Sequence, residues 1–157
     1  MQRVVLICVG KLKERFYAEA AAEYVKRLGR FCKLEIVELP EERLPQDPSP
    51  AQVEAALLKE AQAIRDRLPH ASHLVALCVE GRQPSSEELA RLMASWGEKR
   101  LVFLIGGSFG LHDSIKAEAN ASLSMSSMTF PHHLARVMLL EQVYRAYQIN
   151  AGSRYHK

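Results

Sequence analysis

The chain has 157 residues, 48% hydrophobic and 25% charged, which predicts one globular domain spanning 1–157 and excludes disordered, collagen-like and disulfide-scaffold proteins. The formal net charge is +3, with eight Lys or Arg against four Glu in residues 1–35, and four against one acidic residue in 129–157. Basic ends favour contact with a polyanion, although solvated helix faces show the same pattern.

Four apolar runs of strand length alternate with segments of helical periodicity. The first run is too short to span a membrane and lacks the leader and cleavage site of a secretory signal, so we expect a cytoplasmic protein without membrane contact. The alternation predicts an α/β fold with a mostly parallel sheet flanked by helices. The predicted strands are Val4–Val9, Leu34–Leu39, Leu74–Val79 and Leu101–Ile105.

Helical spacing of apolar residues predicts five helices between and after these strands. Gly29 is the expected C-cap of the first, Ser85 with Glu88 the expected capping box of the third, and Asp113 the expected N-cap of the fourth. Four prolines between residues 40 and 50 predict a surface loop. The helices are expected at Glu14–Leu28, Ala51–Leu68, from Ser85 to Trp96, Asp113–Asn120 and His133–Ile149.

The three cysteines, Cys8, Cys32 and Cys78, lie far apart inside apolar runs. We interpret them as buried small hydrophobic side chains and expect neither a disulfide nor a zinc site.

A glycine-rich turn, Gly106-Gly107-Ser108-Phe109-Gly110, follows the fourth predicted strand, and Gly81 follows the third. Ligands of open parallel sheets bind beyond the carboxyl ends of strands, where glycine lets a ligand approach the backbone. The spacing is neither the dinucleotide fingerprint nor a phosphate loop. A tight turn without a ligand is the alternative.

A serine-rich run follows, in which Ser124, Ser126 and Ser127 surround Met125 and Met128. Hydroxyl and backbone groups beside an apolar floor suit an adenine pocket. An ordinary loop with a buried methionine pair is the alternative.

His132 and His133 stand where the last helix begins, and Arg136 follows one turn later. Histidine moves protons near neutral pH, arginine binds phosphate, and tyrosine, as in the tail at Tyr155, stacks on unpaired bases. A histidine beside a helix start also serves as a cap or surface group. No spacing of metal ligands is present, so no metal is expected.

With these segments identified, the chain resembles the ribosomal large-subunit methyltransferase H family of the SPOUT superfamily. The resemblance covers both ends of the chain and is most specific in the second half. It is carried by Val9-Gly10-Lys11, Leu77, Gly81, Leu104-Ile105-Gly106-Gly107-x-x-Gly110-Leu111, Leu123-Ser124, Met128-Thr129-Phe130-Pro131-His132, Arg136-Val137, Glu141-Gln142-x-Tyr144-Arg145-Ala146 and Tyr155-His156-Lys157.

The resemblance implies a SPOUT fold with a C-terminal trefoil knot, which is a rare exception to unthreaded topology, and a homodimer. It also implies S-adenosyl-L-methionine as methyl donor, and methylation of N3 of a pseudouridine in 23S rRNA, on the ribosome. The implied donor site comprises Leu77, Gly81, Gly106, Gly107, Gly110, Met125, Ser126, Ser127, Met128, Thr129 and Phe130.

For the reaction itself we nominate His132 as proton acceptor, Arg136 as the cation that holds RNA, and Tyr155 with His156 as groups closing over the base. Some relatives have proline where this chain has His133, which makes the proton-handling assignment ambiguous. We also expect the tail of one subunit to approach the donor pocket of the other.

The basic residues Lys11, Lys13 and Arg15 are expected to extend the RNA footprint. Two other functions share this pattern. One is a dinucleotide-dependent oxidoreductase, whose glycine fingerprint is missing, and the other is a non-catalytic RNA-binding module.

Overall fold

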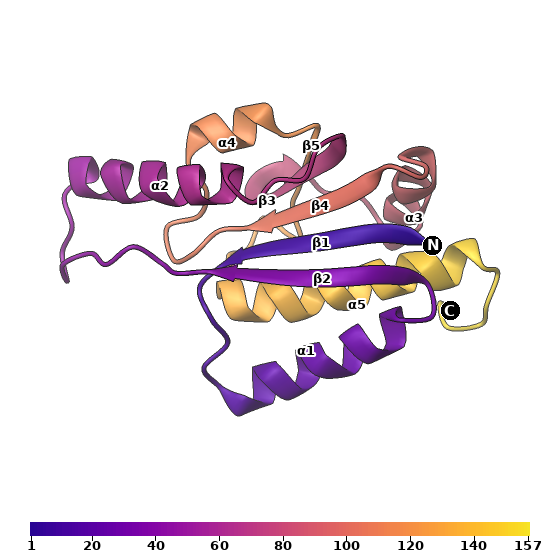
Figure 1. The fold of residues 1–157 in the computed structure, drawn as a ribbon. Helices are drawn as coiled ribbons and strands as arrows, with labels where there is room; N and C mark the ends of the chain where they lie inside the picture. The colour runs from indigo at the N-terminus through magenta and orange to yellow at the C-terminus, as the bar shows by residue number, and fades with distance from the viewer.

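The computed structural model describes residues 1–157 and contains one five-stranded sheet with helices on both faces (Figure 1). The strand order is β2-β1-β4-β3-β5, and every neighbouring pair is parallel. The predicted α/β class with a parallel sheet is therefore confirmed. The strands are β1 Gln2–Val9, β2 Cys32–Leu39, β3 Ser72–Arg82, β4 Arg100–Ile105 and β5 Ala121–Leu123.

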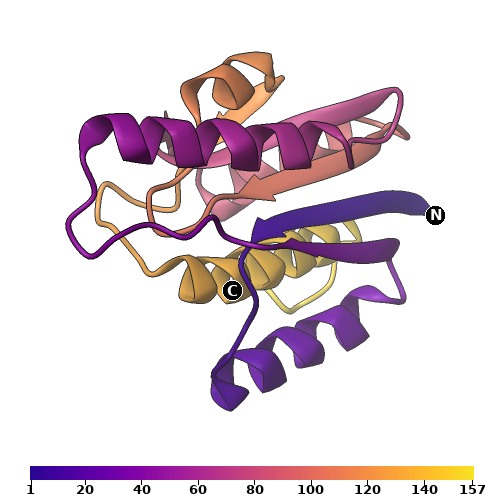
Figure 2. The same ribbon diagram turned by 60° about the vertical axis from the view of Figure 1, so that its left-hand side comes forward.

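Two helical layers enclose this sheet (Figure 2). Helices α1 (Arg15–Leu28), α3 (Ser86–Ser95) and α5 (His132–Asn150) cover one face. Helices α2 (Pro50–Arg65) and α4 (Asp113–Glu118) cover the other. The chain therefore has two hydrophobic cores, one on each side of a shared sheet.

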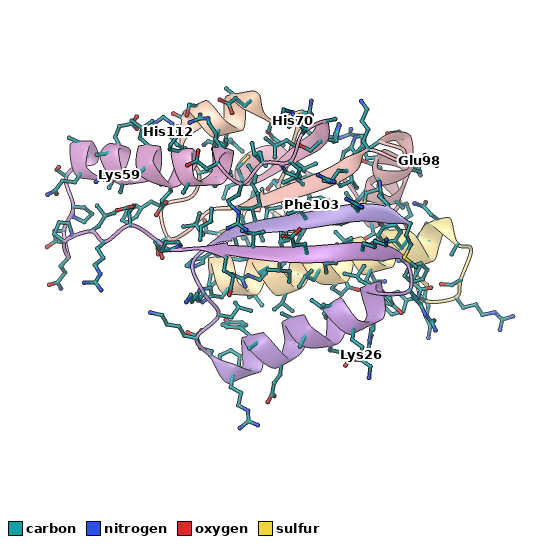
Figure 3. All side chains as sticks on the ribbon, viewed as in Figure 1. Lys26, Lys59, His70, Glu98, Phe103 and His112 are labelled. Carbon is teal, nitrogen blue, oxygen red and sulfur yellow. The ribbon has the colours of Figure 1, made fainter.

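Burial on both faces explains why the central strands are continuous apolar runs rather than alternating ones. Successive side chains of β1 enter opposite cores: Val4 and Leu6 pack beneath α5, and Val5 and Ile7 pack beneath α2. Phe103 on β4, labelled in Figure 3, is 1% exposed and belongs to the core beneath α5.

Several element boundaries differ from the sequence predictions. Gly29 is the C-cap of α1, as predicted, and adopts a right-handed helical conformation with φ −57°; the boundaries of other elements differ. The N-cap of α4 is His112 instead of Asp113, because its ring nitrogen accepts the Ser114 N–H at 3.1 Å. Helix α5 starts one residue early, at His132.

Strand β5 was not predicted, and β3 is longer than predicted. Asn120 fixes the start of β5 beside β3: its N–H donates to the Leu74 carbonyl, and its side-chain oxygen accepts the Leu74 N–H, both at 2.8 Å. Gly81 consequently lies inside the end of β3 and not in a turn beyond it. None of the helices combines the length and the apolar character that crossing a bilayer demands.

Candidate functional site

A cavity of about 730 Å³ opens at the carboxyl ends of β3 and β4. Three segments distant in sequence form its wall: the end of β3 from Leu77 to Glu80, the glycine-rich turn 106–110, and the loop 124–131 that leads into α5. The predicted donor-site residues in this wall are Leu77, Gly106, Gly107, Gly110, Met125, Ser126, Met128, Thr129 and Phe130. Gly81 and Ser127 are not part of the wall.

The glycine-rich turn folds tightly upon itself. The Gly110 N–H donates to the Gly107 carbonyl at 3.0 Å, and Gly110 has φ +78°, which favours glycine. A Cβ on Gly106 would lie 2.3 Å from the Gly110 carbonyl oxygen. The spacing of these glycines is thus required by the turn's own backbone.

Glu41, in the proline-rich loop after β2, anchors this turn from outside. Its Oε1 accepts the Ser108 N–H at 2.7 Å, and a Cβ on Gly107 would meet the same oxygen at 2.5 Å. The carboxylate therefore holds the turn by a charge-assisted hydrogen bond across 67 residues of sequence. Nothing in the sequence pattern marked Glu41, because its partner is a backbone group.

The end of β3 leaves regular pairing beside the cavity. Leu77 and Arg82 both pair with Leu123, so the four residues between them bulge out of the ladder. The bulge brings Cys78, Val79 and Glu80 into the cavity wall. Gly81 serves the packing instead: a Cβ there would lie 2.9 Å from the backbone of Leu123.

The serine-rich loop is organised by its own hydroxyl groups. Ser124 Oγ donates to the Ser126 carbonyl at 2.9 Å, and Ser126 Oγ accepts the Met128 N–H at 3.0 Å. Met125 contacts the core beneath α5, whereas Met128 is 71% exposed. The alternative of a loop with a buried methionine pair therefore does not describe this segment.

Three large apolar side chains at the cavity wall are exposed to solvent. Val79, Phe109 and Met128 are each about half exposed or more, and each comes from a different wall segment. Exposed apolar groups that converge around a concavity mark a binding surface.

His132 is the only titratable ring in the cavity wall. Burial lowers its pKa below the ordinary histidine value, and the neighbouring His133 lowers it further. The imidazole is thus neutral at pH 7 and able to accept a proton. His133 turns to another partner, with Nδ1 3.4 Å from Glu14, and does not line the cavity.

Arg136 is buried, with its side chain 3% exposed. Its Nη1 donates to Glu38 Oε2 at 2.7 Å, and its Nη2 donates to the Gly10 carbonyl at 3.0 Å. These bonds fasten α5 to the ends of β1 and β2. A guanidinium so enclosed cannot present itself to RNA in this chain, which corrects the expectation that Arg136 holds the substrate.

Tyr155 and His156 lie apart from the cavity of their own chain. Tyr155 packs edge-on against Tyr144, and its hydroxyl donates to Glu141 at 3.2 Å. His156 Nε2 lies 2.7 Å from Glu87 on α3. The structure therefore brings His132 to the donor-site residues but leaves the tail on the far half of α5.

No group of three or more His, Cys, Asp or Glu side chains is arranged to hold a metal ion. One ion-pair network lies near the wall, where Lys116 of α4 contacts Glu80 at 2.6 Å and Asp113 at 3.1 Å. The sequence reasoning overlooked both Glu80 and Lys116, since neither belongs to a motif.

Comparison with known proteins agrees with this geometry. A family described as "Predicted SPOUT methyltransferase" matches residues 2–156, so the chain is a SPOUT methyltransferase. A Bacillus thuringiensis (strain Al Hakam) relative named ribosomal RNA large subunit methyltransferase H is 45% identical over 98% of this chain and 99% of its own. A relative of the same name from Bacillus cytotoxicus is 43% identical over the same shares. The chain belongs to the ribosomal RNA large subunit methyltransferase H family.

Two solved structures share the fold at low sequence identity. A probable methyltransferase from Bordetella pertussis Tohama I superposes with TM-score 0.58 at 18% identity, covering 93% of this chain and 95% of its own. A probable methylase family protein from Haemophilus influenzae Rd KW20 gives 0.57 at 12% identity, covering 99% and 71%. With the family established, the oxidoreductase and non-catalytic alternatives are set aside.

Proposed function

We propose that the chain transfers a methyl group from S-adenosyl-L-methionine to N3 of a pseudouridine in 23S rRNA, with the assembled ribosome as substrate. The observation that carries this proposal is the meeting of the three predicted donor-site segments in one cavity. The substrate class is supported by the name of the relatives, ribosomal RNA large subunit methyltransferase H.

The cavity suits the donor in size and in character. Its volume of about 730 Å³ lies within the usual range for ligand sites, and 10 of its 21 lining residues are hydrophobic. Backbone groups of the glycine-rich turn and the hydroxyls of Ser126 and Thr129 supply polar contacts beside that apolar wall. When bound, the donor supplies an electrophilic methyl group on a sulfonium.

The protein's own contribution to the reaction is alignment and proton transfer. The rigid turn anchored by Glu41 fixes one side of the cavity, and α5 fixes the other. His132 accepts the N3 proton of the acceptor base, a role for which its neutral imidazole is suited. The exposed groups Val79, Phe109 and Met128 hold the uracil ring against the cavity.

Arg136 acts in this proposal as a positioning residue. Its bonds to Glu38 and Gly10 set the first turn of α5, four residues after His132. Contacts with RNA fall instead to exposed basic residues such as Lys11, Lys13 and Arg15.

The proposal includes a cytoplasmic homodimer and a C-terminal trefoil knot, both supported by membership of the SPOUT family. In the dimer, Tyr155 and His156 of one subunit close over the acceptor base in the partner's cavity. The proximity of Glu141 to both Tyr155 and a second hollow along α5 is consistent with a subunit contact there.

Mass spectrometry of 23S rRNA from cells with and without this protein tests the proposed function. We expect one methyl group at one pseudouridine to disappear with the gene and to return with the wild-type chain. Unchanged methylation in its absence would refute the proposal.

A further inference from the structure

Four basic side chains converge at the end of the sheet opposite the cavity, around a depression of about 370 Å³. They come from β2, β1, β4 and the turn after α2, and are Lys33, Arg3, Arg100 and Arg67. The only acidic group in the lining is Glu35. In Figure 1 this end of the sheet lies on the right, beside the N-terminus.

Three of these residues form a row across adjacent strands, which we call the basic row: Lys33, Arg3 and Arg100. Arg3 pairs directly with Lys33 in the parallel register. Val4 pairs with Leu101, which places Arg100 beside Arg3 one residue earlier. All three project from the face that α2 covers, because Val37, Val5 and Val102 further along the same strands belong to that core.

None of the four basic groups forms an ion pair, although eleven ion pairs occur elsewhere in the chain. Like charges placed directly opposite each other destabilise a sheet. The arrangement therefore costs stability unless an anionic partner neutralises it.

A second depression adjoins the first and shares Arg3 and Arg100 with it. It adds Lys99 and His70, with Glu98 as its acidic member. The positive surface thus continues from β2 across β1 to the turn before β4, along the end of the sheet.

We propose that the basic row, with Arg67, is a second RNA-binding site that holds backbone phosphates of rRNA away from the reacting nucleotide. Arg and Lys side chains pair with phosphate oxygens, and such contacts carry no sequence information, so the site fixes orientation rather than sequence. The site deepens the proposed function, on which the identity of the RNA rests.

The two sites are separated by the length of a strand. Six residues of extended chain from Arg100 to Gly106 span about 20 Å at 3.3 Å per residue. A nucleotide in the cavity and a phosphate on the basic row therefore belong to different parts of the RNA, which gives a small protein two points of attachment.

The test compares Arg3→Gln/Lys33→Gln/Arg100→Gln with a matched control, Lys26→Gln/Lys59→Gln/Arg91→Gln, which removes the same charge from helices outside the site. Lys26 and Lys59 are labelled in Figure 3 on α1 and α2. Binding to unmethylated ribosomes is measured without the methyl donor over a series of KCl concentrations. Ribosome binding is measured without catalysis, so a result against the basic row can be distinguished from a result against the proposed methyl transfer.

We expect the basic-row variant to bind ribosomes about tenfold more weakly than wild type. The slope of log Kd against log[KCl] should decrease by about two to three, because about three phosphate contacts are lost. The control should change Kd less than threefold. Donor affinity should be unchanged in both variants. Equal weakening in variant and control, or unchanged binding in both, overturns the proposal.

Two further measurements test whether the variant folds and whether the site binds a membrane surface instead of RNA. Thermal unfolding should show a Tm equal to or above wild type for the basic-row variant, since like-charge repulsion is removed; if that variant does not fold, Lys33→Glu alone is measured in the same binding assay. Vesicles of phosphatidylglycerol serve as the lipid arm. Loss of vesicle binding with ribosome binding intact would assign the site to a membrane surface and overturn the RNA assignment.

Discussion

His132 lies at the first position of α5, where the end of a helix meets the wall of the cavity. His133, its neighbour, contacts Glu14 and Tyr17 instead. The two rings differ in surroundings although they are adjacent in sequence, and this difference supports our proposal of His132 as the base.

Replacing His132 with alanine is expected to lower the single-turnover methylation rate about 10²-fold, because the proton acceptor is lost. Since burial lowers the pKa of His132, the wild-type rate should hold at pH 7 and decline only below about pH 6.5, as the imidazole becomes protonated. The measurement is the rate between pH 5 and 9. His133→Ala is the control, and an unchanged rate and pH profile for His132→Ala would refute the role.

Glu41 gives a second prediction at the level of one hydrogen bond. Glu41→Ala should weaken donor binding about tenfold, since the Ser108 N–H loses its acceptor and the turn loosens. Glu41→Gln retains an acceptor oxygen and should recover most of the affinity. Calorimetry with the methyl donor measures both. Glu42→Ala serves as control, and equal affinities for all three variants would contradict the anchoring role.

At the scale of elements, β5 is held to β3 by close approach at Gly81. Gly81→Ala is expected to lower the Tm by several degrees, because the new methyl group would lie 2.9 Å from the Leu123 backbone and force the strands apart. Donor binding should weaken with it, since the displaced strand leads into the serine-rich loop. An unchanged Tm would show that the bulge absorbs the methyl group.

The junction of α5 with β1 and β2 yields a pH-dependent prediction. Burial raises the pKa of Glu38, but the hydrogen bond and charge of Arg136, the N–H of Leu12 and the charge of Lys11 together outweigh it, and the net pKa is below the ordinary value. The ionised pair therefore stabilises the fold above about pH 4.5 and loses this effect as pH falls through the lower folded pKa. Glu38→Gln should cost about 2 kcal/mol at pH 7.

Urea unfolding at pH 7 and at pH 3 measures this difference. We expect the stability gap between wild type and Glu38→Gln to narrow from pH 7 to pH 3, as the carboxylate of the wild type becomes protonated. A stability gap that is as large at pH 3 as at pH 7 would mean that the side chain's packing, and not its charge, is responsible.

The four longer strands could be predicted from the sequence, whereas β5 could not. The runs that became β1 and β4 are apolar throughout, which identifies central parallel strands. Strand β5 has three residues and depends on contacts of Asn120 and Gly81 with β3, so no local pattern marks it.

The candidate site likewise contains parts that the sequence predicts and parts that it does not. The glycine-rich turn and the serine-rich loop are contiguous motifs, and both could be predicted from the sequence as parts of a candidate donor site. Glu41 and the bulge of β3 are positioned by tertiary pairing alone. Arg136 pairs with Glu38, which lies 98 residues away in the sequence. No motif relates these two residues, so the sequence could not show that Arg136 is held inside the protein.

For the whole molecule, removal of residues 154–157 tests the division of labour between cavity and tail. We expect methylation to be lost while donor affinity changes less than twofold, because Tyr155 and His156 lie outside the cavity. Radiolabelled methyl transfer and calorimetry provide the two readouts, and sedimentation compares the oligomeric state of the truncated chain with that of wild type. If the truncated chain lost donor binding together with methylation, the proposed separation of roles between cavity and tail would be wrong.

The bond between Arg136 and the Gly10 carbonyl spans 126 residues of chain. Bringing such distant segments together is slow, because the entropy of closing a long loop is lost before any contact forms. We therefore expect the cavity to be among the last features to form during refolding. Weakening this single tether should accelerate unfolding far more than it retards folding.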